Sequence, residues 1–212
     1  MYAALFMGIS ILTKLIPVLV LPLFIYRLGL KKSVQFVGMT MGVVILGFVP
    51  YINLGFLRNY SQSVDLWFSN FEFNASFYYM LKALTKYYLD ANLIAYMRFI
   101  IPALMGITVL YLYLKKEIKT KTIMKQCLWL LTAYFFLATT VHPWYIIPLV
   151  FLSCYSDYRY PILWSLTIFL SYSAYSQTAV LENPYFLAIE YSVVLSVLIY
   201  ESFKSSQKLK HH

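Results

Sequence analysis

The stretch Val141-His142-Pro143-Trp144-Tyr145 lies between two apolar runs, Leu128 to Val141 and Ile146 to Cys154. It contains the only histidine outside the last two residues of the chain. The proline that follows this histidine cannot continue a helix, and tryptophan and tyrosine are enriched at the boundary between lipid and water. The stretch therefore predicts a turn at one face of a bilayer, with membrane helices on both sides.

The composition of the whole chain is that of a membrane protein. Of its 212 residues, 61% are hydrophobic and only 12% are charged, whereas a soluble domain carries about 25% charged residues. Several apolar runs approach or exceed roughly 18 residues, a length that indicates a spanning helix. We expect an all-α, polytopic helical bundle with about seven membrane segments, forming a single membrane domain over residues 1–212.

The positive charge of the chain is better explained by membrane topology than by nucleic-acid binding. The net charge is +9, but most lysines lie in short loops between apolar runs, where basic residues set the orientation of membrane helices. We expect no nucleic-acid partner. Cys127 and Cys154 fall inside predicted membrane segments and are expected to be apolar filler residues rather than a disulfide.

The first apolar region is interrupted by a lysine. Residues 1–12 and 15–26 are each shorter than a full span, and Lys14 lies between them, followed by Pro17 and Pro22. The region is either one long kinked helix or a pair of short helices with Lys14 at the bend. Lysine at bilayer depth costs about 2.5 kcal/mol or more, and this cost favours the bend.

The later spans and the segment between them follow from the pattern of apolar runs. Residues 51–90 mix charged and aromatic side chains, which predicts a folded segment along the interface with one or two amphipathic helices. On the preceding span, Gly38, Gly42 and Gly47 are spaced for close helix packing. The expected spans after the first region are 33–49, 93–114, 126–141, 145–155, 161–175 and 185–203.

The basic loops predict the orientation of the bundle. Residues 27–32 and 115–125 and the tail 204–212 are rich in lysine and should share the cytoplasmic side. The opposite face then receives the Lys14 bend, the 51–90 segment, His142 and Glu182. All candidate polar features therefore gather on one face.

The residues of the 141–145 stretch are the first candidates for a binding site. His142 can bind or protonate a phosphate oxygen, and Trp144 and Tyr145 can line a sugar or prenyl site. The alternative is an aromatic belt with no role beyond anchoring. Lys14 is a candidate contact for an anionic head group, with a snorkelling interfacial lysine as the alternative.

Charged residues inside the predicted spans give further candidates. Arg98 would bind a substrate phosphate or form a structural pair with Glu72 or Asp90, because membrane arginines face a partner or a water-filled cavity. Glu190 lies about two turns into the last span and is a functional candidate, with an ion pair inside the bundle as its rival. Asn74-Ala75-Ser76 matches a glycosylation sequon, a short match that is common by chance.

The sequence contains no P-loop, zinc-type cluster, dinucleotide fingerprint or Ser-His-Asp order. Three short motifs stand out instead: Thr13-Lys14-Leu15-Ile16-Pro17 with Leu21-Pro22-Leu23, His142-Pro143-Trp144-Tyr145 with Pro148, and Glu182-Asn183-Pro184 with Ala188-Ile189-Glu190-Tyr191. These motifs resemble polytopic glycosyltransferases of the GT-C fold, in their bacterial mannosyltransferase-like branch. The resemblance covers most of the chain but only the C-terminal part of such an enzyme.

This resemblance implies transfer of a hexose, with mannose as the candidate, from a polyprenyl-phosphate donor to a glycan or lipid acceptor. The reaction would take place at the outer face of a bacterial inner membrane, with membrane lipid as a further partner. Lys14, Arg98 and His142 would stabilise the phosphate leaving group, with Trp144, Tyr145 and Glu190 beside them as substrate-binding residues. A divalent metal is an open question, and no metal ligands are assigned.

The resemblance also implies an acidic catalytic residue in a first outer loop, and this chain has no acidic residue before Asp65. We therefore expect the chain to lack N-terminal helices of a larger GT-C protein, whether as a fragment, through a misplaced start or as half of a split protein. Glu72 is a weak local candidate for the general base.

A non-enzymatic membrane protein is the alternative function. Arg98 and Glu190 inside the spans, together with the absent acid, would suit one half of a transporter or a partner subunit. Transporter halves usually show inverted repeats, but the lysine bend, the long outer segment and the His-Pro motif each occur once. The sequence therefore favours the enzyme.

Overall fold

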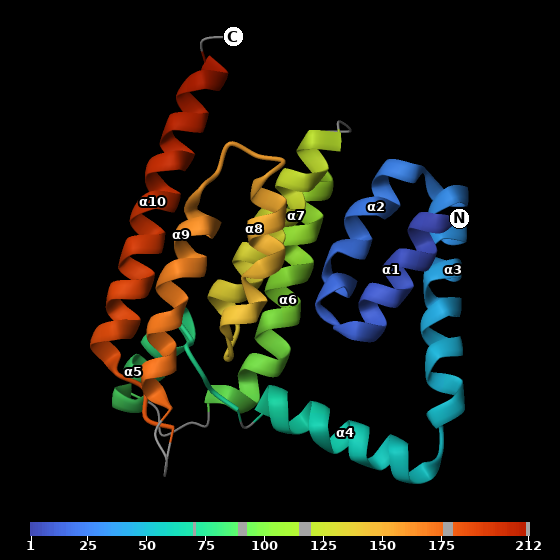
Figure 1. Cartoon of the computed structure of the whole chain (residues 1–212), viewed down its shortest axis with the longest axis horizontal. Helices are drawn as coiled ribbons and strands as arrows, with labels where there is room; N and C mark the ends of the chain where they lie inside the picture. Colours follow the sequence, from blue (N-terminus) through green and yellow to red (C-terminus); the bar gives the residue numbers. More distant parts are fainter. Residues whose placement is uncertain (70, 89–92, 115–119, 176–179, 211–212) are drawn as a thin grey trace.

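The computed structural model describes residues 1–69, 71–88, 93–114, 120–175 and 180–210. Most of these residues are helical, and strand-type pairing among them is limited to isolated bridges, Phe73 with Thr140 and Tyr175 with Val180. Figure 1 shows an N-terminal group of helices, a C-terminal group, and a helix along the lower edge that joins them. The all-α prediction is confirmed for the described part of the chain.

The N-terminal group is a hairpin of short helices packed against a long one. α1 ends at Thr13, Lys14 adopts an extended backbone, and Pro17 lies in the first turn of the 3-10 helix that follows. Because the helix stops at Lys14, the bend is confirmed and the single kinked helix is excluded. The elements are α1 (Tyr2–Thr13), η1 (Ile16–Val20), α2 (Leu21–Leu28), α3 (Leu30–Phe48) and η2 (Val49–Tyr51).

Glycine allows close contact between α1 and α3, but not at all the positions that were expected. A Cβ atom on Gly8 would lie 2.6 Å from Cβ of Val43, and one on Gly47 would lie 2.6 Å from Cδ1 of Leu12. A Cβ atom on Gly38 or Gly42 would meet nothing within 4 Å. The packing prediction is therefore confirmed for Gly47 and wrong for Gly38 and Gly42, because these two glycines lie on a face of α3 that α1 does not cover.

The segment after α3 forms helices separated by a buried extended stretch. α4 (Leu54–Ser69) runs along the lower edge of the molecule in Figure 1, and α5 (Phe77–Tyr88) lies near the C-terminal group. Leu54 and Leu57 on α4 are exposed, as expected for an interfacial helix. Phe73, Asn74 and Ala75 between the helices are buried, which the prediction of an interfacial segment did not include.

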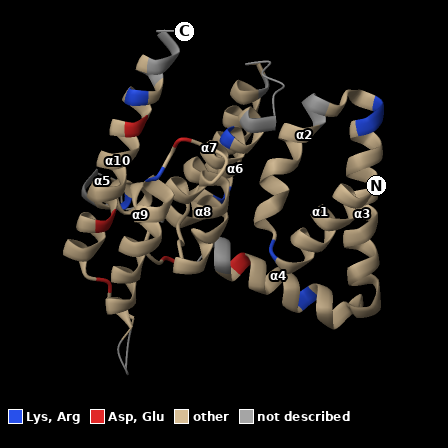
Figure 2. Cartoon of the chain, turned by 45° about the horizontal axis from the view of Figure 1, so that its top comes forward, with Lys and Arg blue, Asp and Glu red and all other residues tan. Residues whose placement is uncertain are grey.

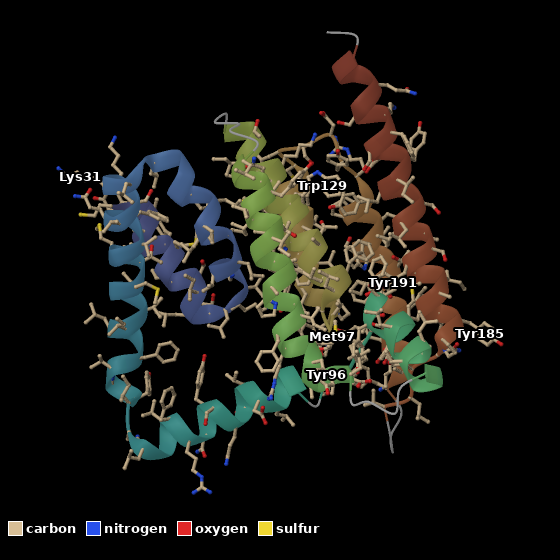
Figure 3. The ribbon with its side chains drawn as sticks, turned by 180° about the vertical axis from the view of Figure 1, so that it is seen from behind. Lys31, Tyr96, Met97, Trp129, Tyr185 and Tyr191 are labelled. Carbon is tan, nitrogen blue, oxygen red and sulfur yellow. The ribbon has the colours of Figure 1, made fainter. Side chains whose placement is uncertain are left out.

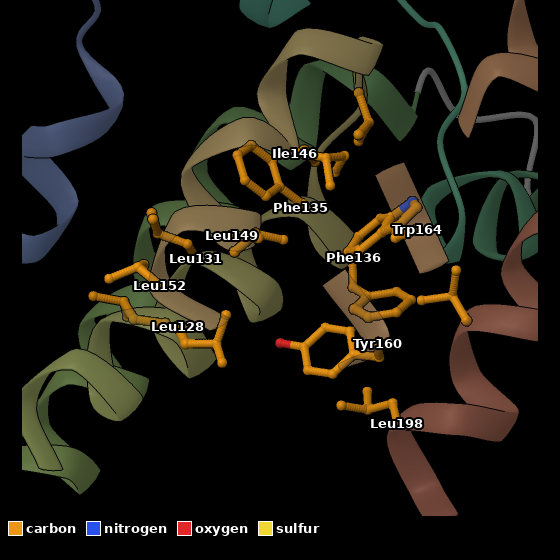
Figure 4. Close-up of a cluster of buried hydrophobic side chains, with 14 of the residues drawn as sticks. Leu128, Leu131, Phe135, Phe136, Ile146, Leu149, Leu152, Tyr160, Trp164 and Leu198 are labelled. Carbon is orange, nitrogen blue, oxygen red and sulfur yellow. The ribbon is translucent and has the colours of Figure 1, made fainter. Parts of the chain in front are cut away.

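The C-terminal group surrounds the main hydrophobic core. α7 crosses its centre, and Figure 4 shows Phe135 and Phe136 of this helix beside Ile146, Trp164 and other buried side chains. α2 and η1 pack against α6 and α7, which connects the two groups. The elements are α6 (Leu93–Leu114), α7 (Thr120–Leu137), η3 (Pro143–Tyr145), α8 (Ile147–Ser153), α9 (Tyr160–Thr167), η4 (Ile168–Ala174) and α10 (Pro184–Lys210).

Three segments of the described chain are long and apolar enough to cross a membrane: Leu30–Tyr51, Leu93–Leu112 and Pro184–Ser205. Their outward side chains are apolar, for example Leu46, Ile107 and Ile199, and so large an apolar surface needs lipid or a partner to cover it. The prediction of about seven spans stays a prediction, because the helices of 126–141, 145–155 and 161–175 are shorter or partly 3-10.

Charged side chains lie mostly near the helix ends and in the connecting segments (Figure 2). α3, α7 and α9 begin, and α10 ends, at the upper edge in Figure 1, whereas α4, α5 and the start of α8 lie at the lower edge. Figure 3 places Lys31 at the upper end of α3. The basic segments thus share one end of the molecule; residues 115–119, 211 and 212 lie outside the described residues, and the cytoplasmic assignment stays a prediction.

Candidate functional site

The His-Pro-Trp-Tyr stretch forms the turn between α7 and α8. His142 has an extended backbone, and Pro143 begins η3, a position that suits proline because the first turn of a helix leaves its N–H groups unpaired. The Tyr145 N–H donates to the His142 carbonyl at 2.9 Å. The side chain of His142 is 4% exposed and that of Trp144 is 42% exposed, so the turn buries the imidazole and presents the indole.

Aromatic rings hold the imidazole of His142 from several sides. Its centroid lies 4.5 Å from the Trp144 ring and 5.0 Å from the Phe73 ring, both nearly parallel to it. The Tyr145 ring lies 5.5 Å away and almost perpendicular. Phe73 reaches this position because its backbone pairs with the segment that follows α7: its N–H donates to the Thr139 carbonyl at 3.0 Å, and the Val141 N–H donates to its carbonyl at 2.8 Å.

The lysine of the N-terminal bend reaches the same turn. The Nζ atom of Lys14 lies 5.1 Å from the centre of the Tyr145 ring, within range of a cation–π interaction. Burial lowers the pKa of His142 below its ordinary value, and the positive charge of Lys14 lowers this pKa further. His142 is therefore a neutral imidazole near neutral pH, beside a cation and an exposed indole.

Glu72 is held by partners other than His142. The Tyr78 hydroxyl donates to one carboxylate oxygen, and Lys82 forms an ion pair with the other. Phe71 and Phe73 on either side both contact the His142 ring. Since successive side chains of an extended stretch point to opposite faces, the carboxylate of Glu72 points away from His142.

Arg98 forms a different ion pair from the one expected. Its Nη1 atom lies 3.8 Å from Oδ1 of Asp65, and both side chains are partly exposed. Glu72 is occupied by Lys82, and Asp90 lies outside the described residues. This contact joins α4 to α6, and the pair is worth roughly 1 kcal/mol or less at such exposure.

Glu190 is fully buried in α10 and is bonded to neutral groups. Its Oε1 atom accepts hydrogen bonds from Asn74 Nδ2 at 3.1 Å and Trp164 Nε1 at 2.9 Å. Within the described residues the ion pairs are Lys82 with Glu72 and Arg98 with Asp65. The expected ion pair of Glu190 is therefore not among them, and a hydrogen-bonded amide takes its place.

Asn74 has a buried hydrogen-bonding role that the sequence did not predict. It is 1% exposed, so the sequon is inaccessible in this fold. Its backbone N–H donates to Glu182 Oε1 at 2.6 Å, and its carbonyl accepts from the Tyr191 hydroxyl at 2.6 Å. Its φ of +49° lies in the left-handed region, which asparagine tolerates better than most residues. The alternation Phe71-Glu72-Phe73 was a signal for the extended stretch that carries it.

The arrangement suits an anionic group attached to a flat, partly apolar ring. Lys14 supplies positive charge and Trp144 supplies an exposed aromatic face. No group of three or more His, Cys, Asp or Glu side chains gathers for a metal among the described residues. No protein-family model, curated protein or solved structure matches this chain.

Proposed function

We propose that this chain is the donor-binding part of a membrane glycosyltransferase of the GT-C type. It would transfer a hexose, with mannose as the candidate, from a polyprenyl phosphate to a glycan or lipid acceptor. One observation carries the proposal: the motif around Lys14 and the motif His142–Tyr145 each resemble a separate element of the family, and Lys14 lies over the Tyr145 ring.

The chemistry of the reaction gives each of these residues a role. The acceptor hydroxyl attacks the anomeric carbon, a new glycosidic bond forms, and the bond from that carbon to the phosphate oxygen breaks. The phosphate leaves with the electron pair, and Lys14 stabilises its developing charge. Trp144 stacks on the sugar, and His142 in its neutral form bonds a phosphate or sugar oxygen.

The hydroxyl proton needs a base that the described site does not supply. The Glu72 carboxylate points away from His142 and is bonded to Tyr78 and Lys82. We propose that a carboxylate, the kind of residue that the family resemblance implies for this role, takes the proton. Exposed apolar side chains on α4, such as Leu54, would rest in the head-group region beside the donor's prenyl chain.

Donor binding tests the proposal without requiring the base. The chain is placed in lipid nanodiscs, and binding of polyprenyl-phosphate mannose is measured at equilibrium. Lys14→Met should weaken binding on the order of tenfold, because a charged contact to the phosphate is lost. Lys204→Met is the matched control: Lys204 Nζ also lies over a tyrosine ring, that of Tyr200 at 5.9 Å, but near the end of α10.

Trp144→Ala separates sugar recognition from phosphate recognition. We expect it to weaken binding of polyprenyl-phosphate mannose while binding of the sugar-free polyprenyl phosphate stays close to wild type, because stacking concerns the sugar alone. Equal donor affinity in wild type, Lys14→Met and Trp144→Ala would reject the donor site. Flux of a solute through vesicles containing the chain would then favour the transporter alternative.

A further inference from the structure

Glu190 belongs to a buried polar cluster that fastens the extended stretch 71–76 to α10. Asn74 Nδ2 and Trp164 Nε1 both donate to Glu190 Oε1, and Tyr191 next to it binds the Asn74 carbonyl. Figure 3 shows Tyr191 pointing into the molecule, whereas Tyr185, earlier on α10, points outward. The cluster therefore lies on the inner face of α10.

Each of the two bonded side chains has one further oxygen that no hydrogen bond satisfies. In the part of the chain that the structure describes, Asn74 Oδ1 and Glu190 Oε2 are buried and have no partner. Both atoms accept hydrogen bonds when Glu190 is ionised, so they cannot bond to each other in that state. A buried carboxylate without a cation, beside an unsatisfied amide oxygen, is an unfavourable arrangement.

We propose that Glu190 is protonated near neutral pH and pairs with Asn74 as a carboxylic acid with a carboxamide. Such groups can join through two hydrogen bonds, one from N–H to oxygen and one from O–H to oxygen. The first is present between Asn74 Nδ2 and Glu190 Oε1. The second would run from Glu190 Oε2 to Asn74 Oδ1, the two atoms that otherwise lack partners.

The neighbouring titratable groups are compatible with a proton at this position. Glu182, before α10, accepts from the Asn74 N–H and from the Tyr79 hydroxyl of α5. Its negative charge disfavours a second carboxylate nearby. Burial and the bond to Glu182 raise the pKa of Tyr79, so Tyr79 stays neutral and a donor. On the other side of the stretch, His142 is neutral and stacks on Phe73.

The shared proton makes Glu190 a positioning residue for the His142 turn. Asn74 follows Phe73, whose ring stacks on His142 and whose backbone bonds to Thr139 and Val141. Ionisation of Glu190 would break the pair with Asn74 and loosen this stretch. The proton site stands independently of the proposed transferase; only an effect on turnover rests on that function.

Amide hydrogen exchange at Phe73 and Val141 in the purified chain is the experiment that tests this proposal. Glu190→Gln should leave the exchange of these amides within about twofold of wild type, because glutamine supplies the N–H that the acid's O–H supplied. Glu190→Ala should speed their exchange on the order of tenfold, because Asn74 and Trp164 lose a buried partner. Infrared spectra should show the carbonyl band of a protonated carboxylic acid that Glu190→Gln removes.

Glu201→Gln is the matched control on the same helix. Among the described residues, the hydrogen bonds that Glu201 accepts come from backbone N–H groups, those of Arg159 at 2.9 Å and Tyr160 at 3.1 Å. A glutamine at this position places an NH₂ group, which cannot accept a hydrogen bond, next to these N–H donors. Amide exchange should therefore rise at the start of α9, while Phe73 and Val141 keep their wild-type exchange rates. The same substitution is therefore expected to leave exchange unchanged near Glu190 and to raise it near Glu201.

A rise in pH distinguishes neutralisation of Glu190 by a proton from neutralisation by a metal ion. In wild type, the exchange rates of Phe73 and Val141 should rise with pH more steeply than the intrinsic rate of an unprotected amide, because Glu190 ionises. Glu190→Gln should remove this additional rise. The proposal is overturned if Glu190→Gln opens the stretch as much as Glu190→Ala. It is also overturned if Na⁺ or Mg²⁺, rather than acid, closes the wild-type stretch, because a metal ion would then neutralise Glu190.

Discussion

His142 is set apart from an ordinary interfacial histidine by what surrounds its ring. Trp144 and Phe73 cover the imidazole, and the Lys14 ammonium group lies over the adjacent Tyr145 ring. Both burial and Lys14 disfavour the imidazolium form. A histidine kept neutral beside a cation can accept as well as donate a hydrogen bond, and a polyprenyl-phosphate sugar offers partners for both.

The effect of Lys14 on His142 is measurable by titration. In Lys14→Met the pKa of His142 should rise towards its ordinary value of 6.5 but stay below it, because burial remains when the charge is removed. Nuclear magnetic resonance of the histidine rings in the labelled protein measures this, with Lys204→Met as the control. An unchanged pKa in Lys14→Met would show that Lys14 does not act on the ring.

The same shift makes stability depend on pH in a definite direction. The pKa of His142 is lower in the folded than in the unfolded chain, so the unfolded chain binds the proton more tightly. The contribution to stability is therefore fully present above 6.5 and is lost as the pH falls from there through the folded-state pKa. Lys14→Met should reduce this loss.

At the scale of residues, the sequence located the turn but not the stretch that holds it. His142 was conspicuous because it is a lone histidine beside a proline, and Lys14 because it interrupts an apolar run. Asn74 carries no comparable local signal: its importance comes from Glu182, Glu190 and Tyr191, which are distant in the chain. Local patterns do not encode such long-range contacts.

At the scale of helices, contact between α1 and α3 depends on which glycine faces the neighbour. Gly8→Ala places a methyl group 2.6 Å from Val43 Cβ and 2.9 Å from the Thr40 carbonyl oxygen. The helices must separate, at a cost of about 1–3 kcal/mol. Gly42→Ala is the matched control, because nothing lies within 4 Å of its added methyl group. Thermal unfolding should show a lower midpoint for Gly8→Ala and an unchanged midpoint for Gly42→Ala.

The glycine comparison also shows what spacing can and cannot predict. Gly38, Gly42 and Gly47 share one helix, yet only Gly47 faces α1. A small residue permits close approach but does not by itself indicate the side from which a neighbour comes. Equal destabilisation by Gly8→Ala and Gly42→Ala would mean that α3 packs in another orientation.

The shorter elements were the hardest to predict from apolar runs. The run 145–155 becomes η3 and α8, and the run 161–175 becomes α9 followed by η4. Hydrophobicity alone does not fix helix length. Prolines at 143, 148 and 161 lie in the first turns of η3, α8 and α9, where they favour the start of a new helix. The long runs of α3, α6 and α10 were predicted well because no such interruption shortens them, although Pro102 lies within α6.

At the scale of the whole molecule, the lysine-rich segments and the His142 turn lie at different ends. The basic segments at the starts of α3, α7 and α9 and the end of α10 share one end, and α4, α5 and the His142 turn share the other. This arrangement does not depend on how many helices cross the membrane or on which side is cytoplasmic. This arrangement is the one that the predicted orientation requires, with the basic segments together on one side of the bilayer.

Labelling of single cysteines tests this arrangement against a real membrane. With Cys127 and Cys154 replaced by alanine, Ser61→Cys places a thiol on exposed α4 and Asp157→Cys places one in the exposed loop before α9. A maleimide that cannot cross membranes should label position 61 in intact bacterial spheroplasts, because the basic loops are predicted to place the other end in the cytoplasm. Position 157 should react only after the membrane is opened, and Ser61→Cys labelled after opening serves as the control for thiol reactivity. Labelling of both positions in intact cells would contradict a separation by the bilayer, and the reverse order would place the His142 turn on the cytoplasmic side.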